Sequence, residues 1–96
     1  MDSTLVDRAS IAASVLDIVR EALFLPPEQA AQVSLGSSFV NDLMIDSLTM
    51  VRIDMLVQNR LHLAIPVEEA TSVDTIDDLV ELLVTRGRPV AENGAG

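Results

Sequence analysis

The residue best placed to carry chemistry is Ser47, which follows Asp46 at the start of a predicted helix. A serine hydroxyl becomes a nucleophile when a general base takes its proton. The chain has no cysteine and one histidine, so a Ser–His–Asp triad would depend entirely on His62. No base for Ser47 is evident in the sequence. We therefore interpret Ser47 as a hydroxyl that is presented at the protein surface and modified by another protein.

The same dipeptide also has a purely structural explanation. Short side chains that carry oxygen accept hydrogen bonds from the free backbone N–H groups at a helix start. Either Asp46 or Ser47 could therefore be an N-cap and nothing more. The protein would then be an unmodified helical adaptor.

The composition excludes several other classes of function. The chain has 96 residues, 49% of them apolar, and its 15 acidic and 6 basic residues give a net charge of −9. Binding to nucleic acids or to an anionic membrane needs a basic surface, which this chain cannot assemble. The lack of cysteine removes disulfides and cysteine metal sites. The acidic surface instead favours protein partners with basic patches.

Length and hydropathy predict one soluble domain. The chain is long enough for a single core, and no apolar run approaches the roughly 20 residues that cross a bilayer. No basic and apolar leader sequence opens the chain. We therefore expect a cytoplasmic monomer that binds neither membrane nor nucleic acid.

The periodicity of the apolar residues predicts an all-α fold. Spacings of three and four residues indicate helices over about 7–24 and 47–61, and a third that begins after a capping box at Thr75 and stops near Gly87. A short helical turn is expected over about 68–72. The predicted architecture is a four-helix bundle with three main helices and one short helix.

We assign this bundle to residues 7–86, with a flexible or helix-extending segment at 1–6 and a disordered tail at 87–96. A long loop over about 25–46 joins the first two main helices, and Pro27 could begin a short helical turn within it. Four apolar side chains are expected to pin this loop onto the core: Leu35, Phe39, Val40 and Leu43.

The helix at 47–61 has two apolar faces. Met50, Ile53, Val57 and Leu61 share one face, and Leu48, Val51 and Met55 share another. A domain of this size cannot easily bury both. We expect the first face to pack inward and the second to remain available to a partner.

Two sequence runs resemble the signature of acyl carrier proteins. The first is Phe39-x-x-Asp42-Leu43-x-x-Asp46-Ser47-Leu48-x-x-Val51, and the second is Ile65-Pro66-x-Glu68-Glu69-Ala70. The order of the predicted helices is also similar, so the resemblance covers roughly residues 7–86.

The resemblance implies a non-catalytic carrier protein. Ser47 would receive 4′-phosphopantetheine from coenzyme A through a phosphopantetheinyl transferase, and the thiol of that arm would carry acyl groups as thioesters. Asp46 matches the family aspartate that contributes to transferase recognition. Leu48, Val51 and Met55, with Arg52 among them, match the face that meets acyl-loading and acyl-processing enzymes.

Two departures from the family pattern shape the expected pathway. Met44 stands where the family commonly has glycine. Arg52 and Arg60 lie at or near positions that are usually acidic, and Asp54 is the only acid between Ser47 and Leu61. We therefore expect a discrete carrier in a specialised pathway of polyketide, lipopeptide or unusual fatty-acyl synthesis. A peptidyl or aryl carrier protein, which uses the same serine and arm, remains an alternative.

Overall fold

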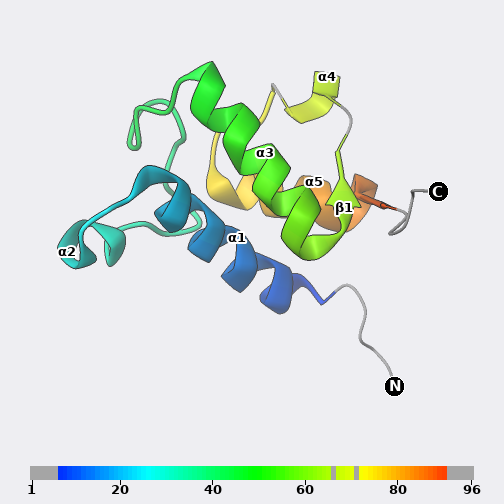
Figure 1. Ribbon diagram of the computed structural model, residues 1–96, viewed down its shortest axis with the longest axis horizontal. Helices are drawn as coiled ribbons and strands as arrows, with labels where there is room; N and C mark the ends of the chain where they lie inside the picture. Colours follow the sequence, from blue (N-terminus) through cyan, green and yellow to red (C-terminus); the bar gives the residue numbers. More distant parts are fainter. Residues whose placement is uncertain (1–6, 66, 71, 91–96) are drawn as a thin grey trace.

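The computed structural model describes residues 7–65, 67–70 and 72–90. Three long helices dominate this part of the chain (Figure 1): α1 (Arg8–Leu23), α3 (Ser47–Leu61) and α5 (Ile76–Arg86). Two single-turn helices, α2 (Pro27–Ala30) and α4 (Val67–Ala70), interrupt the connections. The predicted all-α bundle is confirmed, and the turn proposed at Pro27 forms. The predictions for residues 1–6 lie outside the described residues.

The capping box predicted for α5 is present. The backbone N–H of Asp78 donates to the Thr75 hydroxyl over 3.1 Å, and the Asp78 carboxylate accepts from the backbone N–H of Thr75 over 3.1 Å. Together these bonds satisfy two backbone donors at a helix start. The helix ends where predicted, at Gly87, where any β-carbon would lie 2.5 Å from the carbonyl oxygen of Leu83.

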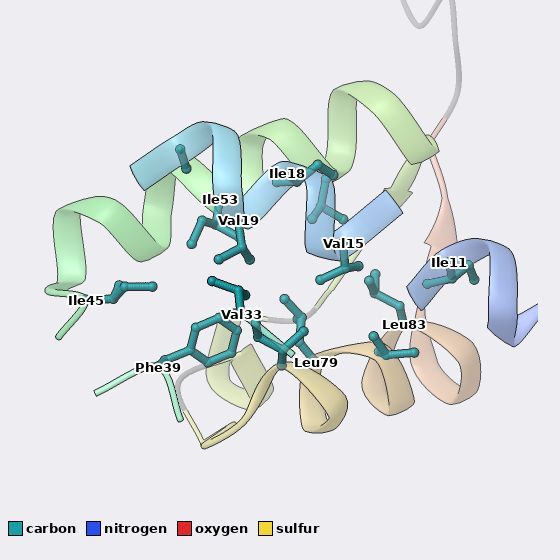
Figure 2. Close-up of a cluster of buried hydrophobic side chains, with 14 residues drawn as sticks. Ile11, Val15, Ile18, Val19, Val33, Phe39, Ile45, Ile53, Leu79 and Leu83 are labelled. Carbon is teal, nitrogen blue, oxygen red and sulfur yellow. The ribbon is translucent and has the colours of Figure 1, made fainter. Parts of the chain in front are cut away.

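The core lies where α1 packs against α3 and α5. Ile53 and Val57 are buried, as predicted for the inward face of α3. Figure 2 shows side chains from the long loop in the same cluster as those of the three helices. The loop contributes Val33, Phe39 and Ile45.

The long loop between α2 and α3 is anchored to the start of α5. The backbone N–H of Phe39 donates to the carbonyl oxygen of Asp74 over 2.8 Å, and the N–H of Asp77 donates to that of Leu35 over 2.8 Å. The Ser38 hydroxyl donates to the Asp74 carboxylate over 2.9 Å. These bonds and the buried Phe39 ring hold the loop in one arrangement although it has little regular structure.

One predicted anchor of this loop is wrong. Leu35 and Leu43 are partly buried against the core and Phe39 is fully enclosed, but Val40 is 65% exposed. Phe39 and Val40 are neighbours in a turn, where consecutive side chains point in different directions. The inward place is taken by the larger Phe39 side chain, so Val40 faces outward.

The prediction of a disordered tail from residue 87 is also wrong for its first residues. Strand β2 (Arg88–Pro89) pairs antiparallel with β1 (Leu63–Ala64), and the backbone N–H of Val90 donates to the carbonyl oxygen of His62 over 2.9 Å. The extended segment after α3 has backbone N–H and C=O groups on its edge, and the segment after α5 can form hydrogen bonds with them. The ordered unit therefore extends beyond residue 86. Residues 91–96 lie outside the described residues.

Candidate functional site

Ser47 is the first residue of α3, and its side chain is exposed. The N-cap is its neighbour Asp46, whose carboxylate accepts a hydrogen bond of 2.9 Å from the backbone N–H of Thr49. This bond lowers the pKa of the Asp46 carboxyl. Within the described residues the Ser47 hydroxyl makes no hydrogen bond. The capping explanation therefore accounts for Asp46 and leaves the exposed hydroxyl of Ser47 without a structural role.

The turn before Ser47 alternates between exposed and buried residues. Met44 is 82% exposed and has a φ of 54°, in the left-handed region that glycine adopts most readily. Ile45 follows and is buried in the core. Its backbone N–H also donates to the carbonyl oxygen of Phe39 over 2.8 Å. Ile45 thus fixes the backbone immediately before Asp46 and Ser47.

The second apolar face of α3 is exposed, as predicted. Leu48, Val51 and Met55 are 77%, 52% and 60% exposed. Within the described residues, all the exposed large apolar side chains except Phe24 lie between positions 40 and 55. An apolar surface of this kind, concentrated around one exposed hydroxyl, is typical of a protein-docking site.

A pocket of about 340 Å³ opens beside Ser47. Phe39 and Ile45 of the loop, Met50 of α3, and Ala70 and Val73 near α4 supply apolar lining. A pocket of this volume and character suits a small apolar ligand. Ser47 itself is among the residues that line this pocket, and Figure 1 shows that the first turn of α3 lies at the end of that helix far from β1. The hydroxyl and the pocket therefore belong to one site.

Comparison with known families decides to which family the chain belongs. The family model for the phosphopantetheine attachment site matches residues 13–83, which is most of the chain and includes Ser47 and the residues that line the pocket. The chain belongs to the acyl carrier protein family.

Curated relatives agree with this assignment. The chain is 34% identical over 74 residues to an acyl carrier protein of Bdellovibrio bacteriovorus, an alignment that covers 77% of this chain and 91% of the relative. It is 34% identical over 71 residues to one of Wolinella succinogenes, covering 74% and 90%. A meromycolate extension acyl carrier protein of Mycobacterium leprae is 32% identical over 75 residues, covering 78% and 63%.

Membership of the acyl carrier protein family implies a covalently attached 4′-phosphopantetheine group, and the residues present fit that group. Attachment needs a hydroxyl that an enzyme can reach, and the Ser47 side chain is exposed and makes no hydrogen bond with the described residues. The acyl chain at the end of such an arm needs apolar shelter, which the neighbouring pocket offers. No described helix is long and apolar enough to span a membrane.

The charged side chains of α3 differ in their surroundings. Arg60 pairs with Glu21 of α1, with 2.5 Å between nitrogen and oxygen, so it joins two helices of this carrier protein. Arg52 is exposed and forms no ion pair with the described residues. Arg52 lies between Val51 and Met55, so the apolar face of α3 carries one cation that is available to a partner.

The sequence did not reveal the place of Asp54, which we noted only as the single acid between Ser47 and Leu61. Asp54 lines the pocket, and burial raises the pKa of its carboxyl. One of its carboxylate oxygens, Oδ1, is fully buried and has no hydrogen-bond partner within the described residues. The signal was present in the spacing, because Asp54 is four residues after Met50 and therefore shares a helix face with it.

Proposed function

We propose that Ser47 is the attachment residue for 4′-phosphopantetheine and that the protein is a non-catalytic carrier of acyl groups. The observation that supports this most directly is an exposed hydroxyl that caps nothing, next to an apolar pocket, within the residues that match the attachment family. When bound, the arm supplies a thiol that holds acyl groups as thioesters.

The proposed modification exchanges a phosphoanhydride bond of coenzyme A for a phosphate ester bond at Ser47. The Ser47 Oγ–H bond and one P–O bond of the coenzyme A pyrophosphate break, and an Oγ–P bond forms. Adenosine bisphosphate leaves, and the serine proton passes to a base of the transferase, because the Ser47 hydroxyl makes no hydrogen bond to a base within the described residues. Asp46 holds the first turn of α3 in place and presents a carboxylate beside the reacting hydroxyl for transferase recognition.

We further propose that the partners are a phosphopantetheinyl transferase and the acyl-loading and acyl-processing enzymes of a specialised pathway, which meet the carrier as a monomer. Leu48, Val51 and Met55 supply a small apolar contact that permits quick release. Arg52 places a positive charge within that contact, which repels the basic docking faces of standard fatty-acid enzymes. A partner with a neutral or acidic rim fits this surface better.

Intact-mass measurement tests the attachment. The protein is incubated with coenzyme A and a broad-specificity transferase, beside the variants Ser47→Ala and Ser10→Ala. Ser10 is an exposed serine of α1 and serves as a matched control. We expect wild type and Ser10→Ala to gain the mass of one phosphopantetheine and Ser47→Ala to gain nothing. A wild type that gains no mass, or a gain that persists in Ser47→Ala, contradicts the proposal and favours the unmodified adaptor.

A second measurement tests the choice of pathway. Loaded wild type and Arg52→Glu are offered to ordinary fatty-acid elongation enzymes. We expect wild type to be a poor substrate and Arg52→Glu to improve turnover, because the substitution replaces a repulsive charge by an attractive one. Efficient elongation of wild type, with no change in Arg52→Glu, contradicts the specialised role and leaves the attachment proposal intact.

A further inference from the structure

Asp54 is a carboxylate in an otherwise apolar part of the pocket beside Ser47. It lies one turn beyond Met50 on α3, and both side chains line the same cavity. Its Oδ1 atom is fully buried without a hydrogen-bond partner in the described part of the chain. A buried oxygen without a partner is costly, because it has lost its hydrogen bonds to water and gained none from protein.

No side chain of the described residues can supply that partner from its present position. The other polar groups that line the pocket are Asp46 and Ser47. The Asp46 carboxylate is engaged by the backbone N–H of Thr49, and the Ser47 hydroxyl is exposed and makes no hydrogen bond. An apolar side chain at position 54 would suit Phe39, Met50 and Val73 around it. The carboxylate therefore points to a partner that enters the pocket from outside.

We propose that Asp54 selects acyl chains that carry a hydrogen-bond donor, a hydroxyl or an amino group, over plain alkyl chains of the same length. This inference rests on the function proposed for Ser47, because the acyl chain reaches the pocket from an arm at that residue. When the Asp54 carboxylate turns toward the cavity that it lines, the donor gives Oδ1 the hydrogen bond that it lacks, and the rest of the chain lies against the apolar lining. A plain alkyl chain instead displaces the remaining water from the carboxylate and supplies no hydrogen bond in its place.

The preference should be measurable as the equilibrium ratio of acyl chain inside the pocket to acyl chain in solvent. A site built to hydrogen-bond a substituent discriminates strongly against an analogue without it. The Asp54 side chain is only partly buried, so we expect the in-pocket fraction of a donor-bearing chain to exceed that of a plain chain about tenfold. An ionised carboxylate also attracts an ammonium group, so the hydroxyl and amino chains are tested separately.

The experiment uses the full chain loaded with three arms that end in amide-linked acyl groups: a saturated alkyl chain, its hydroxyl derivative and its amino derivative. Mass measurement first establishes that each arm is attached. The NMR shifts of the backbone amides of Met50, Val51 and Ala70 then report the ratio of chain inside the pocket to chain in solvent. The same ratios are measured for Asp54→Val, Asp54→Asn and a control variant, Asp17→Val, at an exposed position of α1.

We expect wild type and Asp17→Val to prefer the donor-bearing chains and Asp54→Val to prefer the alkyl chain. Asp54→Asn keeps an acceptor oxygen without a charge, so it should retain the preference for the hydroxyl chain and lose any extra preference for the amino chain. Equal ratios for all chains in wild type, or a donor preference that survives in Asp54→Val, overturn the inference while the attachment proposal stands. A protein that takes up no arm contradicts both.

Discussion

The Asp46 carboxylate accepts a 2.9 Å hydrogen bond from the backbone N–H of Thr49, so the residue before Ser47 determines where α3 begins. Asp46 therefore has a structural task that does not depend on any partner. Its proposed contribution to transferase recognition is a second task, which requires the charge as well as the oxygen. Variants that keep one property and lose the other can separate the two.

Asp46→Asn should preserve stability and slow modification. Asparagine caps helices as well as aspartate does, whereas alanine does not. We expect Asp46→Asn to melt close to wild type and Asp46→Ala to melt several degrees lower, measured by circular dichroism. Both variants should accept the arm more slowly than wild type, measured by mass against time. A wild-type rate of modification in Asp46→Asn would show that the transferase does not recognise the charge.

Met44→Gly should stabilise the protein and Met44→Val should destabilise it. The residue has a φ of 54° and an exposed side chain, so a substitution there changes backbone strain and removes little packing. The left-handed conformation costs about 1–2 kcal/mol for residues other than glycine, and part of the gain on mutation to glycine is offset by the entropy of the unfolded chain. We expect a net gain of about 0.5–1 kcal/mol for Met44→Gly in denaturant unfolding. A loss of stability in Met44→Gly contradicts the assigned strain.

Asp54→Val should stabilise the unloaded protein at neutral pH by about 1 kcal/mol, because it removes a buried oxygen that lacks a partner within the described residues. Burial raises the pKa of the Asp54 carboxyl above its ordinary value of 3.8. Below pH 3.8 the carboxyl is protonated in both the folded and the unfolded state, so the ionised form imposes no penalty. The penalty appears as pH rises through the folded-state pKa. The stability difference between Asp54→Val and wild type should therefore grow from acid to neutral pH in chemical denaturation; a difference that shrinks contradicts this assignment.

The two phenylalanines should differ widely in their contribution to stability. Phe39 is 2% exposed and Phe24 is 79% exposed. We expect Phe39→Ala to lower the free energy of unfolding by about 3–5 kcal/mol, as is typical when a buried aromatic ring is removed. Phe24→Ala serves as the control and should change it by no more than about 0.5 kcal/mol. Similar losses in the two variants would mean that Phe39 does not anchor the loop.

Local signals were sufficient to predict the helices. The capping box at Thr75 and Asp78, Pro27 at the start of α2 and the two apolar faces of α3 all act within a few residues, and the structure confirms each. The sequence left open whether Asp46 or Ser47 was the cap, because either side chain can accept the bond. Only the backbone geometry assigns the cap to Asp46.

The features that the sequence did not predict depend on distant partners. Strand β2 forms because the segment after α5 pairs with β1, and no local pattern within Arg88–Pro89 predicts that pairing. Val40 is exposed because Phe39 takes the inward place in the turn. Asp54 lines a pocket because residues distant in sequence, Phe39 and Val73, form other parts of its wall. In each case the deciding contact is far away along the chain.

The hydrogen bonds between the long loop and the start of α5 also have a consequence for the order of events during synthesis. Phe39 and Leu35, which fix the approach to Ser47, bond to Asp74 and Asp77, and Asp77 follows Ser47 by about thirty positions. Domains fold as units once their interacting segments have been translated. In a chain still attached to the ribosome, with α5 inside the exit tunnel, the loop before Ser47 would lack its hydrogen bonds to Asp74 and Asp77. Ser47 would then follow a loop that is not yet fixed in place. We therefore expect the carrier to become a substrate for its transferase only after most of its C-terminal third has emerged.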